Sequence, residues 1–282
     1  MSTRVVNNFK TVLLLGGLMG LFLAAGSMWG QSGLILAFLF GGLVNVIAWF
    51  FSDKIAIAAM RGRELSRETG GDLYTMTERL AQNANLPMPK LYLCPHQAPN
   101  AFATGRNPRK AAVAVTQGAI DLLDPFEMEG VIAHELAHIK NRDTLISCIA
   151  ATIAGVLAFL AQWGFWLGIG NRQANPFVMI IVIIIAAVGA AMIKAMISRS
   201  REFVADADGA KIAGSPFGLI SALKKLEMYS GRIPLQQPNP AQNNLFIVEP
   251  LASAARGGNP LLRMFATHPP TERRVAELSK LG

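Results

Sequence analysis

Two histidines and a glutamate stand at a spacing that suits metal-dependent hydrolysis. His134, Glu135 and His138 follow a strong helix start, Asp124 with Pro125 behind it. At 3.6 residues per turn, His134 and His138 lie one turn apart on one face, so both imidazoles can reach the same ion. Glu135 can then face the open coordination position and take a proton from metal-bound water. The motif predicts a site for one Zn²⁺ per chain.

The alternative is a helix with two ordinary histidines. The residues around the motif are apolar, so unligated imidazoles beside a carboxylate would need other partners there: Val131, Ile132, Ala133, Leu136, Ala137 and Ile139. The metzincin extension requires glycine at position 141 and histidine at position 144. Those positions are Asn141 and Thr144, which excludes that class.

A catalytic zinc needs a third protein ligand. The candidate donors are His96, His268 and the carboxylates that follow residue 198. We expect Glu202 to be the ligand and Asp206, one helical turn later, to orient an imidazole through its other nitrogen. Alanines 205, 207 and 210 would let this helix approach the histidine-bearing one closely. The alternative is that both carboxylates are solvated and balance nearby arginines.

Charge is distributed unevenly along the 282 residues, of which 52% are hydrophobic and 16% charged. Residues 11–52 contain no Asp, Glu, Lys or Arg, and residues 144–193 contain only Arg172. Soluble globular chains carry about 25% charged residues, so this pattern excludes a purely soluble or disordered protein. The net charge of +8 comes from scattered Lys and Arg without a basic stripe, and we expect no nucleic-acid partner.

The two charge-poor blocks are each long enough for two membrane spans. The predicted spans are 12–29, 34–51, 145–169 and 177–197, which form two hairpins. Lys and Arg flank the outer ends of both hairpins, so the positive-inside rule puts both termini and the soluble sequence in the cytoplasm. A cleaved signal peptide over residues 4–27 is a less well supported alternative. Only Cys94 and Cys148 are present, which excludes a disulfide framework.

The soluble sequence mixes helical and strand-like patterns. We expect helices over 53–86, from residue 124 through the histidine motif, and over 270–281, with strands at 90–94 and 111–116 and a loop at 231–244. Residues 113–116 could be an edge strand that pairs with an extended substrate, or an ordinary core strand. The expected organisation is a first hairpin (1–52), a first protease part (53–143), a second hairpin (144–197) and a second protease part (198–282).

These motifs together resemble the HtpX family of membrane-bound zinc endopeptidases, which is related to the CAAX prenyl proteases. The likeness covers nearly the whole chain and includes the histidine motif and three further segments: 100–108, 201–206 and 267–273. It implies a mainly α membrane protein with four transmembrane helices and a cytoplasmic, zincin-like α+β protease domain with a small sheet. It also implies a bacterial inner-membrane enzyme, bound to the lipid bilayer, that degrades misfolded or damaged membrane proteins.

The resemblance assigns roles to individual residues. It implies zinc held by His134, His138 and Glu202, with Glu135 as the base and His268 assisting near the scissile carbonyl. Two other functions stay open: an intramembrane protease of the site-2 type, and a non-enzymatic membrane scaffold. Charged residues flank the histidine motif on both sides, which favours a metal at the membrane surface over one inside the bilayer. The sequence does not predict an oligomeric state.

Overall fold

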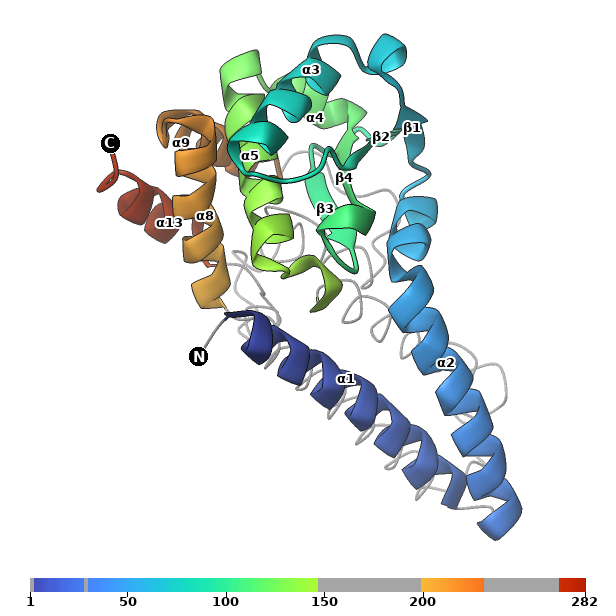
Figure 1. Cartoon of the computed structure of the whole chain (residues 1–282). Helices are drawn as coiled ribbons and strands as arrows, with labels where there is room; N and C mark the ends of the chain where they lie inside the picture. Colours follow the sequence, from blue (N-terminus) through green and yellow to red (C-terminus); the bar gives the residue numbers. More distant parts are fainter. Residues whose placement is uncertain (1–2, 28–29, 147–198, 231–268) are drawn as a thin grey trace, which may run out of the picture.

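A pair of long helices leads into an α+β head (Figure 1). The structure is a computed structural model that describes residues 3–27, 30–146, 199–230 and 269–282. Helices α1 (Thr3–Gly26) and α2 (Gly30–Ala59) pack on each other. The amide of Asn45 on α2 donates a hydrogen bond of 3.0 Å to the backbone carbonyl of Leu15 on α1.

One helix among the described residues is long and apolar enough to cross a membrane, over Gly30–Phe51. The apolar stretch of α1, Val12–Ala24, is shorter than a full span. The predicted spans at 145–169 and 177–197 lie almost entirely outside the described residues. Four transmembrane helices therefore remain an expectation.

The expected continuous helix over 53–86 is wrong. Helix α2 ends at Ala59, Arg61 takes a left-handed conformation (φ 50°), and strand β1 follows at Arg63–Leu65. Helix α3 (Arg67–Asn83) then starts afresh, with Ser66 and Thr69 capping each other's backbone N–H groups. Such a capping box marks a helix start through local hydrogen bonds, whereas the spacing of apolar residues continues across the boundary and does not reveal it.

Four strands form a mixed sheet in the order β1-β2-β4-β3. Strand β2 (Lys90–Cys94) runs parallel to β4 (Ala111–Thr116), while β1 and β3 (Ala101–Gly105) run antiparallel to their neighbours. Strand β4 is thus central, and the prediction that 113–116 form an edge strand is wrong. All five residues of β3 are buried, so its sequence lacks the polar alternation that marks a half-exposed edge.

Helix α5 (Pro125–Asn141) runs through the centre of the head. The sheet and α3 pack on one side of it and α8 (Arg199–Ala213) and α9 (Phe217–Ser230) on the other, with α13 (Thr271–Leu278) against α8 and α9 (Figure 1). Short helix α4 (Gln117–Leu122) links β4 to α5. The segments before and after residues 147–198 therefore share one hydrophobic core.

Glycine lets α8 approach α5 at backbone distance. A Cβ added to Gly209 would lie 2.9 Å from the Cα of His134 and 3.0 Å from its backbone nitrogen. Contacts of that length are too short for real Cβ atoms in an undisturbed structure, so residue 209 has no room for a side chain. The expected alanines are thus accompanied by Gly209, where α8 meets the backbone of α5 too closely for a side chain.

Candidate metal centre

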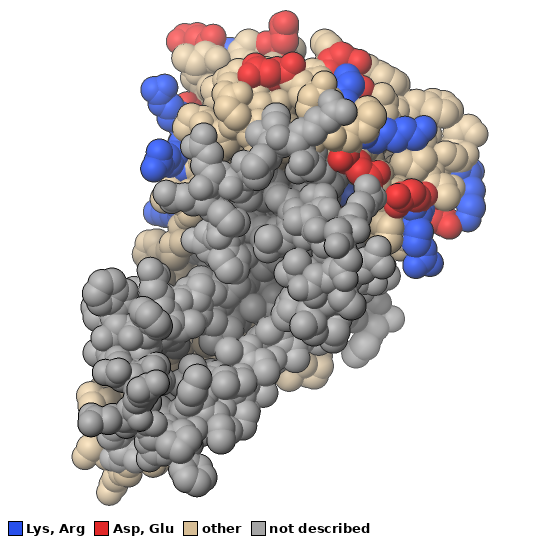
Figure 2. All heavy atoms as spheres, turned by 180° about the vertical axis from the view of Figure 1, so that it is seen from behind, with Lys and Arg blue, Asp and Glu red and all other residues tan. Residues whose placement is uncertain are grey.

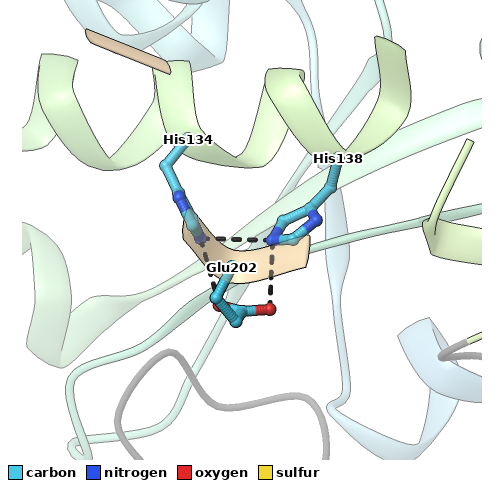
Figure 3. Close-up of side chains that lie close together, drawn as sticks. All are labelled: His134, His138 and Glu202. Atoms are coloured by element: carbon cyan, nitrogen blue, oxygen red, sulfur yellow. Dashed lines mark hydrogen bonds and ion pairs between the residues drawn. The ribbon is translucent and has the colours of Figure 1, made fainter. Parts of the chain in front are cut away.

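The three expected metal ligands converge between α5 and α8 (Figure 3). His134 and His138 project from α5 towards Glu202 in the first turn of α8. The two Nε2 atoms lie 3.2 Å apart. Glu202 Oε2 lies 3.8 Å from Nε2 of His134, and Glu202 Oε1 lies 3.6 Å from Nε2 of His138. One donor atom from each of the three side chains lies within 4.8 Å of the other two.

The spacing of these donors fits a tetrahedral ion. Zinc–nitrogen and zinc–oxygen bonds of about 2.0–2.1 Å at tetrahedral angles separate neighbouring donor atoms by about 3.3 Å. The two Nε2 atoms are 3.2 Å apart, close to that value, and the two oxygens of Glu202 lie 3.8 Å from His134 Nε2 and 3.6 Å from His138 Nε2 respectively. His134, Glu202 and most of His138 are buried, so the three donors face a site shielded from bulk water. The donor set thus suits Zn²⁺ with one coordination position left open.

Glu135 lies beside this donor set with its carboxylate buried (5% exposed). Its Oε2 accepts a hydrogen bond of 2.7 Å from the backbone N–H of Ala103 in β3. Burial raises the pKa of the Glu135 carboxyl above its ordinary value, and the charge of Glu202 adds to the effect, against the opposing influence of the two histidines. A carboxylate with a raised pKa is better able to accept and return a proton near neutral pH.

Asp206 lies behind His134, as the sequence predicted for an orienting carboxylate. Its Oδ1 is 3.0 Å from Nδ1 of His134. The guanidinium of Arg274, on α13, donates to both carboxylate oxygens, from Nε at 2.9 Å and from NH2 at 2.6 Å. Burial alone would raise the pKa of Asp206, but Arg274 outweighs it and lowers the pKa to about 2. Asp206 is therefore ionised at all physiological pH values.

Sequence reasoning missed Arg274, although it is 1% exposed and touches three residues of the site. Besides binding Asp206, its NH1 lies 3.9 Å from Glu202 Oε2 and its NH2 lies 3.4 Å from His134 Nε2. The available signal was a charged residue on a strongly amphipathic helix directly after the His268 segment. Nothing local to α13 indicates that this arginine points into the core.

A second carboxylate lies behind His138. Asp143 Oδ2 is 3.3 Å from Nδ1 of His138, and Asp143 Oδ1 is 3.7 Å from NH1 of Arg201. Burial favours the neutral imidazole, but the negative charges of Glu202 and Asp143 prevail and raise the pKa of His138 to about 9. The metal-free site therefore holds a proton that a cation must displace. Sequence reasoning assigned no role to Asp143.

The two remaining histidine candidates do not join this group in the described structure. His96 Nε2 lies 3.1 Å from the backbone carbonyl of Met60, next to the end of α2, and it therefore serves to join β2 to that helix. His268 lies outside the described residues, so its expected role remains a prediction.

Comparisons with known proteins agree with this architecture. The model of peptidase family M48 matches residues 67–281. The chain is 46% identical to "Protease HtpX homolog" of Persephonella marina over 98% of both chains. It is 46% identical to the protein of the same name from Sulfurihydrogenibium sp., over 99% of this chain and 97% of that one, and 45% identical to that of Nostoc punctiforme, over 98% and 96%.

A solved structure has a related fold. The crystal structure of S. mikatae Ste24p matches with a TM-score of 0.50 and 17% sequence identity, over 98% of this chain and 66% of that chain. The resemblance to the HtpX family is confirmed by near-full-length relatives at about 45% identity. This chain belongs to peptidase family M48 and is a membrane-bound metalloprotease.

Proposed function

We propose that this protein is a zinc endopeptidase that hydrolyses misfolded or damaged membrane proteins at the cytoplasmic face of a bacterial inner membrane. The observation that carries the zinc assignment is the convergence of His134, His138 and Glu202, whose donor atoms lie within 4.8 Å of one another. The buried carboxylate of Glu135 beside them supplies the base that hydrolysis requires. One ion per chain completes the site.

In the proposed mechanism, the chain contributes proton transfer and orientation. Zinc, when bound, lowers the pKa of its water towards about 7 and polarises the scissile carbonyl. Glu135 takes the proton of the attacking water and delivers it to the leaving amine. Asp206 and Asp143 keep Nδ1 of the two histidines occupied, so that each Nε2 faces the ion. His268 is proposed to donate to the developing oxyanion near the scissile carbonyl.

The substrate is proposed to add to β3, which takes over the role expected for residues 113–116. Strand β3 is one of the two edge strands of the described sheet, with β1 at the other edge, and β4 is paired on both sides. The N–H of Ala103 is directed away from β4, because it donates to Glu135. An extended peptide along this edge would therefore pass close to the base. Backbone pairing recognises the main chain, which suits a protease for misfolded sequences.

The metal centre is proposed to lie at the membrane surface, in contrast to a site-2 protease. His138 is six residues before Thr144, where the second charge-poor block begins, and α5 ends between them at Asn141. The hydroxyl of Thr144 donates to the carbonyl of Gly105, and Arg106 stacks 5.1 Å from the ring of Phe50, near the end of the apolar stretch of α2. The ends of both charge-poor segments thus contact the head at neighbouring residues, Gly105 and Arg106. We place the metal ligands on the side of this contact that faces away from the membrane.

The distribution of charge also supports a head that lies outside the bilayer. Figure 2 shows the Lys, Arg, Asp and Glu side chains of the described residues on the head, whereas the described atoms visible at the opposite end carry none. We propose four spans with both termini in the cytoplasm, as the flanking Lys and Arg of both hairpins indicate. Membrane-embedded or membrane-proximal chains are then the polypeptides within reach of the site.

The test is Glu135→Gln in the purified, zinc-loaded full chain, with an unfolded protein as substrate. We expect zinc stoichiometry to stay at one per chain and cleavage to fall by at least about 10³-fold, because the base is lost while the ligands remain. Glu129→Gln is the matched control, since it makes the same change on the same helix at a residue that only pairs with Arg79. Undiminished cleavage by the Glu135 variant would overturn the mechanism.

A further inference from the structure

Asp143 reaches the metal centre through an unusual end of α5. Arg142 takes a left-handed conformation (φ 59°, ψ 36°), and the backbone N–H of Asp143 donates back to the carbonyl of His138 at 3.0 Å. This is a Schellman end, which folds the chain over the last helical turn and normally uses glycine at the left-handed position. The fold-back brings the Asp143 carboxylate to 3.3 Å from Nδ1 of His138.

The partner of Asp143 comes from the other end of a long intervening segment. Asp143 directly precedes residues 144–198, and Arg201 follows them in the first turn of α8. Their side chains are 5% and 12% exposed, with 3.7 Å between the Asp143 Oδ1 and Arg201 NH1 atoms. The two ends of the segment that separates His138 from Glu202 are therefore held together next to a metal ligand.

The two histidines have parallel but unequal support. His134 faces Asp206, which Arg274 holds through two short hydrogen bonds at complete burial. His138 faces Asp143, whose contact with Arg201 is longer and less buried. Each imidazole is thus backed by an aspartate, and each aspartate by an arginine from a segment distant in sequence.

We propose that Asp143 and Arg201 are a positioning pair: Arg201 holds the Asp143 carboxylate, which in turn holds His138 in its metal-binding orientation. The pair makes metal affinity depend on how the two ends of segment 144–198 are held relative to each other. A shift of α8 relative to the end of α5 would separate Arg201 from Asp143 and release the ring. This inference rests on the zinc site proposed above and adds to it a structural control from the membrane-bound part of the chain.

The experiment measures zinc affinity of the full chain by competition with a chelator, and the Co²⁺ absorption spectrum as a report on ligand geometry. Asp143→Asn should weaken affinity by about 10–100-fold, the usual effect of losing an outer partner of a ligating histidine. Arg201→Gln should weaken it in the same direction, and Arg201→Lys should recover most of the loss. The control is Lys140→Gln, an exposed residue next to the last residue of the same helix, which should leave affinity unchanged.

A double variant separates positioning from general destabilisation. If Arg201 acts through Asp143, then Arg201→Gln should add less than about threefold to the loss already caused by Asp143→Asn. Independent, multiplicative losses would overturn the proposal, and so would single variants that bind zinc within about threefold of wild type with an unchanged Co²⁺ spectrum. Absence of stoichiometric zinc from the wild-type chain would instead refute the proposed function itself. Thermal unfolding of the metal-free variants identifies any that fail to fold.

Discussion

Arg274→Met tests whether the core of the metal centre depends on a charge supplied by α13. Methionine is similar in length and apolar, so it fills much of the same space without the guanidinium. It removes both hydrogen bonds to Asp206 and leaves the carboxylates of Asp206 and Glu202 buried beside each other, at 2% and 5% exposure. Removing one partner of a buried ion pair costs about 3–5 kcal/mol, because the other charge is left uncompensated.

That cost is a large share of a typical folding free energy of about 5–15 kcal/mol. For a domain of this size, 1 kcal/mol lowers Tm by about 2–4 °C, so the variant should unfold about 6–20 °C below wild type. The measurement is thermal unfolding of the metal-free full chain by circular dichroism at pH 7. Metal-free protein is required, because bound zinc would stabilise wild type further by mass action.

Two further variants make the outcome specific. Arg274→Lys keeps the charge but loses the bidentate hydrogen bonding to a carboxylate, and its Tm should lie between those of wild type and Arg274→Met. Combining Arg274→Met with Asp206→Asn removes both members of the pair, and it should restore part of the lost stability, since no buried charge then lacks its partner. A Tm within about 3 °C of wild type for Arg274→Met, or no recovery in the double variant, would refute the reasoning.

Three other predictions follow from local features of the head. Gly209→Ala should lower the free energy of unfolding by about 1–3 kcal/mol and weaken zinc binding, because the new Cβ meets the backbone of His134 at 2.9 Å. The control is Gly16→Ala, whose new Cβ meets nothing within 4 Å and which should change neither the stability nor the zinc affinity. Arg142→Gly should raise the free energy of unfolding by about 0.5–1 kcal/mol, because glycine takes the left-handed conformation without strain, and an unchanged or lower Tm would contradict this. Burial opposes ionisation of Glu127, but Lys225 and Ser221 lower its pKa below the unfolded value of about 4.3. The ionised Glu127 therefore stabilises the fold above that pH, and this stabilisation is lost as the pH falls through the folded pKa. The Tm of Glu127→Gln should lie below that of wild type at pH 7, and the difference should shrink below about pH 4.

The candidate metal ligands could be read from the sequence because helical periodicity places them. His134 and His138 are four residues apart on one helix, and so are Glu202 and Asp206 on another, and the structure puts each pair on a common face. The start of α5 could also be predicted from neighbouring residues, since Asp124 and Glu127 cap each other's backbone N–H groups. Interactions within one turn depend on residue types and spacing, which the sequence contains directly.

The parts that escaped prediction depend on contacts between distant segments. Arg274 lies 68 residues from Asp206, and no periodicity relates the two. Strand β3 is buried throughout and shows no polar alternation, so its sequence pattern does not set it apart from the turn-rich stretch around it. The interior position of β4 follows from its pairing with β3 on one side and β2 on the other. Sheet order and buried ion pairs are properties of the packed chain, and a single sequence gives only the segments from which they form.

The order of the site residues along the chain has a consequence for biosynthesis. The carboxylates and imidazoles on α5 and α8 are made first, and Arg274, the cation that neutralises them, is made last. Asp206 and Glu202 therefore gain this partner only after α13 has been synthesised and has docked on α8. The ion-pair cluster behind His134 is thus completed by a helix that follows both ligand-bearing helices in the chain.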